Sequence, residues 1–203
     1  PLGEGRVREL DAARGEIEQL VDAVHCHART LALLAPALQA RGVEATRESL
    51  VELMAEMEQR FPGSREQSVF ASVELSLQRL SAANRERARV LGVFHGGVDL
   101  DVLAMMMQWE KADLSALAVE LVETGLATPN RYNHLTLNPA LCPTLRGRLD
   151  AAEHEALTAR WEKAMRAYVG FLVQQCRQDA EMATTLTGLE LPNLFALLDR
   201  VQR

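Results

Sequence analysis

Residues 90–137 read VLGVFHGGVDLDVLAMMMQWEKADLSALAVELVETGLATPNRYNHLTL and decide the fold of the chain. Apolar residues recur at helical spacing before Gly96-Gly97, again over residues 99–107, and again over residues 113–124. Residues 126–137 then alternate on both sides of a Pro-Asn turn, as the two strands of a β-hairpin do. Three helices followed by a hairpin predict a winged helix.

The predicted winged helix extends over residues 81–149. Ser81 is placed to cap its first helix, because a serine hydroxyl can accept a hydrogen bond from the first-turn N–H groups. After the hairpin, Asn138 followed by Pro139 favours the start of another helix, with the proline at its first position.

Residues 1–80 predict a small bundle of about four helices. Gly15 is expected to break the first helix, Pro36 to kink the second or mark a first turn, and Thr46 to cap the third. Residues 61–64, Phe-Pro-Gly-Ser, are expected to end that third helix.

Residues 150–203 predict a long connecting helix over 150–187 that Gly188 and Pro192 then break. A last short helix over residues 193–201 would suit the first member of a helical repeat array. The predicted fold class is therefore all-α with a small β-hairpin wing: a helical bundle, a winged helix and a long C-terminal helix.

The composition favours a folded protein without a nucleic-acid partner. Hydrophobic residues make up 48% of the chain and charged residues 25%, enough for a core and too apolar for disorder. The net charge is -6, and none of the three predicted regions carries an excess of basic residues. None of them is therefore attracted electrostatically to the phosphates of a nucleic acid. The odd number of cysteines, Cys26, Cys142 and Cys176, argues against a disulfide scaffold. With no apolar run of ~20 residues and no signal peptide, we expect a cytoplasmic protein outside the membrane.

The sequence indicates no enzyme. A P-loop needs Gly-Lys-Ser or Gly-Lys-Thr, and neither of the two lysines, Lys111 and Lys163, follows a glycine. His25-Cys26-His27 does not predict a metal site, because consecutive residues on a helix point about 100° apart. His134 and His154 have no evident acidic or nucleophilic partner, so no catalytic residues can be named and no metal or cofactor is expected.

Winged helices often read DNA with their third helix. That helix needs Arg, Lys, Asn or Gln side chains at the base edges. The corresponding helix here, predicted over residues 113–124, contains Asp113, Glu120 and Glu123 and no basic residue. Phosphate would repel it, so DNA binding through this helix is disfavoured.

Several segments, taken in their order along the chain, resemble the region that follows the nucleotide-binding domain in STAND (signal transduction) ATPases of the NB-ARC type. This family includes plant disease-resistance proteins, apoptotic-protease activators and bacterial proteins with tetratricopeptide repeats. The resemblance extends from about residue 16 to the end. It is carried by ARTLAL (28–33), SVELSL (72–77), LGVFHGGVDL (91–100), LAVELVETGL (117–126), LTLNPAL (135–141) and ELPNL (190–194).

The resemblance implies a regulatory region. In the family a small helical domain and a winged-helix domain close over a bound nucleotide and pass its state to a C-terminal repeat array. Two positions that contact the nucleotide in the family, a proline and a histidine, correspond here to Thr30 and Asn138. Any contact with ADP or ATP would then belong to a longer parent protein that carries the P-loop. The expected partners are proteins or other domains of that parent, with self-association possible.

Two other functions remain open. One is a stand-alone winged-helix adaptor that binds protein partners. The other is a DNA-binding transcriptional regulator that uses a surface other than the acidic helix.

Overall fold

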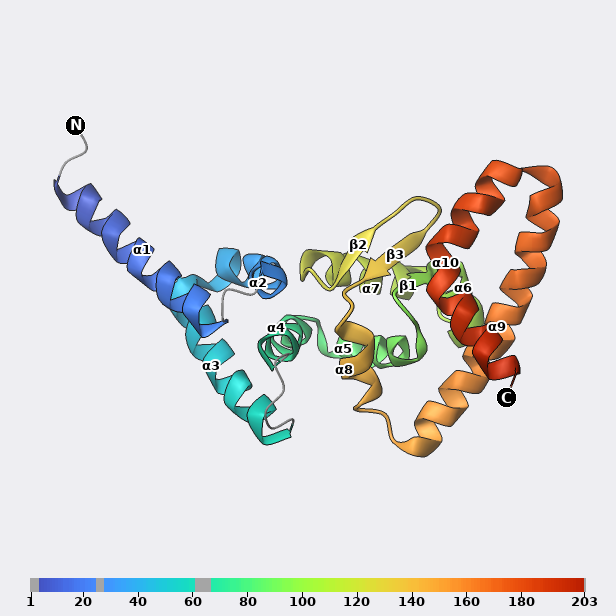
Figure 1. The fold of residues 1–203 in the computed structure, drawn as a ribbon, viewed down its shortest axis with the longest axis horizontal. Coiled ribbons are helices and arrows are strands. Elements are labelled where there is room, and N and C mark those ends of the chain that lie inside the picture. The colour runs from blue at the N-terminus through green and yellow to red at the C-terminus, as the bar shows by residue number, and fades with distance from the viewer. Residues whose placement is uncertain (1–3, 25–27, 61–66, 203) are drawn as a thin grey trace. The chain divides into compact units, whose positions relative to one another are not determined.

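A computed structural model describes residues 4–24, 28–60 and 67–202 (Figure 1). The chain divides into two compact units, Pro1–Arg79 and Leu80–Arg203, here called unit 1 and unit 2. The fold is mostly α-helical with a small antiparallel sheet, which confirms the predicted fold class. None of the helices over the described residues combines the length and the apolar character that crossing a bilayer requires.

Unit 1 packs its described helices around one apolar core. The helices are α1 (Glu4–Ala23), α2 (Ala28–Arg41), α3 (Val43–Arg60) and α4 (Gln67–Gln78). α2, α3 and α4 each contribute two leucine or alanine side chains at helical spacing to the core, and α1 contributes Leu20, with Val24 directly after its end. These are Leu20, Val24, Leu34, Ala37, Leu50, Leu53, Ala71 and Leu75.

Two of the local predictions for unit 1 are wrong. α1 continues through Gly15, because a single glycine inside a helix costs only about 1 kcal/mol relative to alanine. α3 begins at Val43, directly after Gly42, which has a left-handed φ of 83°. Thr46 is therefore not a cap: it lies in the first turn, and its hydroxyl donates to the Gly42 carbonyl. Pro36 does lie inside α2. His25-Cys26-His27 and the predicted stop at 61–64 fall outside the described residues.

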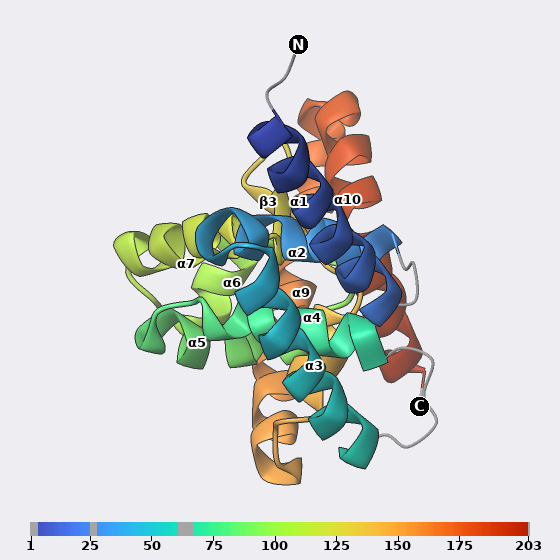
Figure 2. The same cartoon turned by 90° about the vertical axis from the view of Figure 1, so that its left-hand side faces the viewer.

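Unit 2 contains the predicted winged helix. Its elements are α5 (Ala82–Ala88), the 3-10 helix η1 (Arg89–Val93), β1 (Gly97–Asp99), α6 (Leu100–Met107), α7 (Lys111–Glu123), β2 (Ala127–Pro129) and β3 (His134–Leu137). Ser81 caps α5 as predicted, since its hydroxyl accepts from the N–H of Asn84. Figure 2 shows α5, α6 and α7 gathered on one side of the unit.

The sheet has a strand that the sequence did not predict. Its order is β1-β3-β2, and both pairings are antiparallel. β1 is only three residues long and all three are buried, so it shows none of the alternation by which a strand is recognised. It places Asp99 opposite His134 on β3.

The remaining elements of unit 2 are α8 (Leu141–Arg146), α9 (Ala151–Gln178) and α10 (Ala180–Val201). α8 begins at Leu141, two residues later than predicted. Asn138 instead forms a short turn, in which its side-chain oxygen accepts from the N–H of Ala140. α9 and α10 form an antiparallel pair that packs beside the winged-helix elements (Figure 1).

The predicted break at Gly188 and Pro192 is wrong. α10 runs through both residues, and the chain reverses at Asp179. Asp179 has an extended backbone, and its carboxylate accepts from the N–H of Met182, so it caps α10. Pro192 is tolerated inside α10 even though it has no N–H to donate to the preceding turn.

Candidate functional site

Three polar side chains are buried where α10 meets the sheet of the winged helix. His134 comes from β3, and Glu190 and Asn193 come from α10. His134 is 2% exposed and the other two are fully buried. The Nε2 atom of His134 lies 3.1 Å from Oε1 of Glu190. We call this cluster the polar junction.

Asn193 joins the polar junction to the backbone. Its Nδ2 donates to Oε2 of Glu190 over 2.7 Å and to the carbonyl of Gly97 over 2.9 Å. Its Oδ1 accepts from the N–H of His95 over 2.8 Å. One side chain of α10 therefore bonds both the strand β1 and the segment that leads into it.

The sequence builds the polar junction by placing polar residues within an apolar helical stripe. The buried side of α10 repeats at steps of three and four residues, which is one face of a helix: Ala183, Leu186, Glu190, Asn193 and Leu197. Gly97 in β1 and Gly96 directly before it leave room for this buried face of α10. A Cβ at Gly96 would lie 3.3 Å from the ring of Pro192, and one at Gly97 only 2.5 Å from the ring of His134.

Burial makes the polar junction specific for one arrangement of α10 on the sheet. A buried polar group that loses its partner costs about 1–3 kcal/mol, and a buried charge costs more. Any sliding or rotation of α10 would separate Glu190 and Asn193 from their partners on the sheet. The winged helix and α10 are therefore held in one relative position.

The polar junction lacks the geometry of a catalytic centre. It is closed to solvent and has no hydroxyl or thiol nucleophile among its members. The nearby thiol of Cys142 is buried, which raises its pKa to about 11 and keeps it protonated near neutral pH. Across the described ranges of the chain, no three His, Cys, Asp or Glu side chains gather as metal ligands would.

The two predicted nucleotide-contact residues belong to different units. Thr30 is fully buried on α2 of unit 1. Asn138 is half-buried in unit 2, where its backbone N–H donates to Leu126 and its backbone carbonyl accepts from Leu141. These bonds fix the turn between β3 and α8, and nucleotide contact by either residue remains a prediction.

Sequence reasoning set His134 aside because no acidic partner was evident, and the structure corrects this by placing Glu190 beside it. Glu190 follows 56 residues later in the chain, so no local spacing connects the two. A usable signal was present nonetheless: Glu190 and Asn193 occupy inward positions of an apolar stripe, and buried polar residues in such positions require partners.

The third helix of the winged helix turns some of its acidic side chains toward its own unit. The carboxylate of Asp113 pairs with Arg87 over 2.7 Å, and Glu120 accepts from the N–H of Ser81 over 2.8 Å. Burial alone would raise the pKa of Glu120, but this N–H and its neighbours lower it. The helix starts at Lys111, earlier than predicted, so it does contain one basic residue.

Comparisons with known proteins give no relative from which a function could be carried over: no family model, no curated protein and no solved structure matches this chain.

Proposed function

We propose that this chain is a non-catalytic regulatory region of a STAND-type signalling protein. In that role its winged helix follows the nucleotide state of a P-loop domain and passes it to a C-terminal repeat sensor through protein–protein contacts. The proposal rests first on the resemblance of six segments in their order along the chain. It includes the prediction that Thr30 and Asn138 lie near the nucleotide in the parent protein.

The polar junction is the observation that carries this proposal. A relay must move the repeat array whenever the winged helix moves, so the two must be joined rigidly. Asn193 and Glu190 join α10 to β1 and β3 through buried hydrogen bonds and a close histidine contact. Because these contacts are buried and directional, displacement of the sheet would displace α10 with it.

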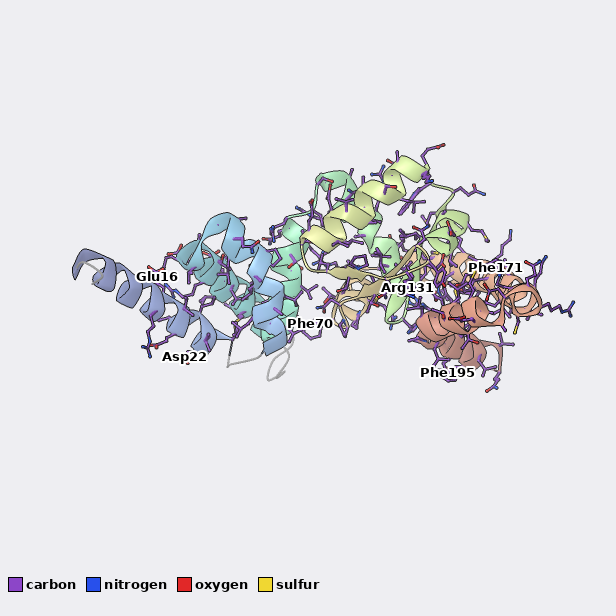
Figure 3. The ribbon with its side chains drawn as sticks, turned by 90° about the horizontal axis from the view of Figure 1, so that it is seen from above. Glu16, Asp22, Phe70, Arg131, Phe171 and Phe195 are labelled. Carbon is purple, nitrogen blue, oxygen red and sulfur yellow. The ribbon has the colours of Figure 1, made fainter. Side chains whose placement is uncertain are left out.

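An exposed apolar stripe on α10 supports contacts with further helices. The stripe recurs at helical spacing along α10, and its most exposed member, Phe195, is 62% exposed (Figure 3). A helical repeat that continued the chain would cover such a stripe. Its members are Leu191, Phe195, Leu198 and Val201.

The same stripe favours the adaptor as a second candidate function. A stand-alone winged-helix adaptor would cover it with a partner protein instead of its own repeats. The two functions differ in whether a P-loop domain belongs to the same natural protein.

The test uses the natural protein that contains this chain. Its coding sequence upstream of Pro1 is expected to encode a P-loop and an acidic Mg²⁺ motif. In that protein, Asn193→Ala should change the rate of ADP release by about 5-fold or more, the lower end of typical coupling between sites. Fluorescent ADP displaced by excess ATP in a stopped-flow instrument measures this rate.

Thr185→Ala on the exposed side of α10 is the matched control and should leave ADP release unchanged. A natural protein without a P-loop domain would contradict the relay and favour the adaptor. An unchanged rate in Asn193→Ala, in a protein that has the P-loop, would show that the polar junction does not carry the coupling.

A further inference from the structure

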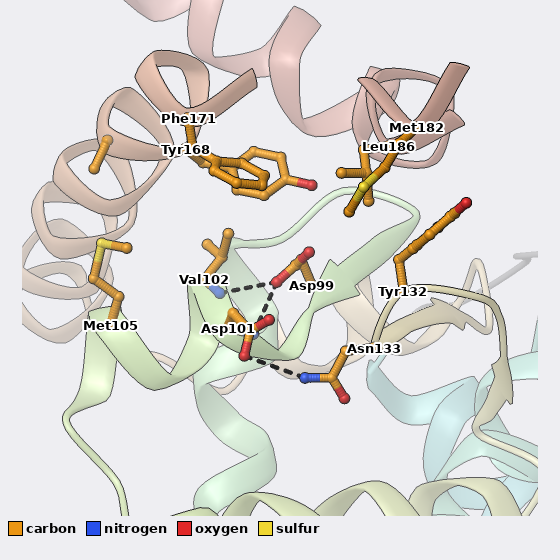
Figure 4. Close-up of a pocket in the computed structure, with 11 residues that line it drawn as sticks. Asp99, Asp101, Val102, Met105, Tyr132, Asn133, Tyr168, Phe171, Met182 and Leu186 are labelled. Carbon is orange, nitrogen blue, oxygen red and sulfur yellow. Dashed lines mark hydrogen bonds between the residues drawn. The ribbon is translucent and has the colours of Figure 1, made fainter. Parts of the chain in front are cut away.

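A cavity of about 440 Å³ lies in unit 2 between the start of α6, the hairpin loop, α9 and α10 (Figure 4). We call it the wing pocket. Its walls are mostly apolar, with Val102 and Met105 on α6 and Met182 and Leu186 on α10. A cavity of this size and character suits a small organic ligand.

The polar side of the wing pocket is acidic. Asp99 and Asp101 line it, and no lysine, arginine or histidine is among the described side chains that do. One oxygen of Asp99 accepts from the N–H groups of Asp101 and Val102. The other oxygen points toward the hydroxyl of Tyr168 (Figure 4).

The charge of Asp99 is only partly compensated by the protein. Burial raises the pKa of Asp99, while the two N–H groups of α6 act in the opposite direction. A positively charged group in the wing pocket would compensate the remaining charge. A carboxylate or phosphate there would meet two aspartates and no cation, so an anionic ligand is disfavoured.

Aromatic rings form another part of the wall. The ring centroids of Tyr168 and Phe171 on α9 lie 5.8 Å apart, and Tyr132 stands across the cavity on the hairpin loop. Tyr132 and Phe171 are each about two-fifths exposed, which places them at the opening. Ring faces attract cations as well as apolar groups, and the sulfurs of Met105 and Met182 adapt to either.

The hairpin loop is held in place over the wing pocket. Tyr132 and Asn133 both adopt left-handed backbone conformations, with φ values of 55° and 60°. Such conformations are unfavourable for residues other than glycine, least so for asparagine. Asn133 is fixed by two contacts: its Nδ2 donates to Asp101 and its carbonyl accepts from Leu100. This arrangement keeps Tyr132 at the opening before any ligand arrives.

We propose that the wing pocket binds a small organic cation, namely an amine attached to an apolar or aromatic body. The ammonium group would lie against Asp99 and Asp101, and the body would lie among the rings and methionines. Ligand binding here is independent of the proposed relay between nucleotide and repeats, because it needs neither a P-loop nor the polar junction.

Three probes of nearly the same shape test the proposal on the full chain at pH 7. They are 4-phenylbutylamine, 4-phenylbutan-1-ol and 4-phenylbutyrate, which carry a positive, a neutral and a negative end. Titration followed by protein NMR shifts should give millimolar or tighter binding of the amine, as expected for about ten non-hydrogen atoms. The amine should bind at least about tenfold more tightly than the alcohol, and the carboxylate should bind most weakly.

Three variants separate the charge from the apolar wall. Asp99→Asn keeps a side chain that caps α6, but it removes the charge, so it should weaken amine binding about tenfold and leave alcohol binding unchanged. Phe171→Ala, at a partly exposed position, should weaken both probes. Asp101→Asn is a second charge variant at an exposed position, and it keeps the test valid if Asp99→Asn fails to fold.

Equal affinities for the three probes would overturn the proposal. So would amine binding that neither aspartate variant weakens, or no shift of wing-pocket resonances at about 10 mM amine, the weak end for a ligand of this size.

Discussion

At the residue scale, Gly97 shows how little space the polar junction leaves. A Cβ atom at this position would lie 2.5 Å from Cε1 and 2.8 Å from Nε2 of His134. Real Cβ atoms do not approach other heavy atoms so closely, so the imidazole would have to move. Its movement would break the contact with Glu190, which has no second partner for that oxygen among the described side chains.

We therefore expect Gly97→Ala to lower the free energy of unfolding of unit 2 by about 1–3 kcal/mol, the usual cost of an overpacked buried site. Urea denaturation followed by the fluorescence of Trp161, which is buried in this unit, measures the change. Trp109 contributes to the same signal from the same unit, so it does not confuse the assignment.

Gly170→Ala is the matched control. Nothing lies within 4 Å of a Cβ at Gly170, and the residue is exposed in the middle of α9. Alanine is the better helix former, so this variant should be more stable by about 0.5–1 kcal/mol. If both alanines had the same effect, the crowding at His134 would not be the cause.

At the element scale, the sequence predicted which segments are helical better than where they end. The hydrophobic period identified α6, α7 and the hairpin because each has a buried and an exposed side. It placed the end of the long helix at Gly188 and Pro192, although α10 runs through both residues and packs against α9 and β1. Tertiary contacts decided this boundary, and a local propensity scale does not contain them.

The polar junction and the wing pocket could not be predicted from the sequence for a similar reason. Each combines residues that are distant in the sequence, such as His134 with Glu190 and Asp99 with Phe171. β1, which brings Gly97 and Asp99 beside β3, is too short to show a strand pattern. The predictions for Thr30 and Asn138 came from resemblance rather than from local chemistry; in the structure Thr30 is buried in unit 1 and Asn138 lies in the turn before α8.

Asp179 is the residue that determines where α10 begins. It ends α9 and caps α10, with its carboxylate 2.9 Å from the N–H of Met182. Asp179→Ala should cost about 1 kcal/mol, since it removes a cap, whereas Asp179→Asn should cost much less because asparagine caps equally well. Thermal unfolding followed by circular dichroism compares the two. An equal loss in both variants would mean that the charge of Asp179 matters and the cap does not.

At the scale of the whole molecule, charge limits the kinds of partner. The chain carries 28 acidic and 22 basic residues. Basic side chains of unit 2 are partly used within the unit: Arg87 pairs with Asp113, and Arg89 with Glu86 and Glu153. This acidic charge disfavours a polyanion as partner, whereas it does not oppose a partner protein that binds the apolar stripe of α10.

We therefore expect this chain not to bind duplex DNA. A DNA-binding protein that contacts several phosphates loses affinity steeply with salt, and its non-specific Kd is roughly 1–100 μM at physiological salt. Fluorescence anisotropy of a labelled 20-base-pair duplex should show no binding up to about 100 μM protein in 50 mM salt, where such attraction is stronger still.

Replacing the exposed Glu123 by lysine supplies a control, because it adds positive charge to the end of α7 without touching the core. Weak binding by Glu123→Lys alone would confirm that the acidic surface of α7 opposes DNA. Binding by the natural chain with a steep salt dependence would contradict this view and return the winged helix to DNA recognition through another surface.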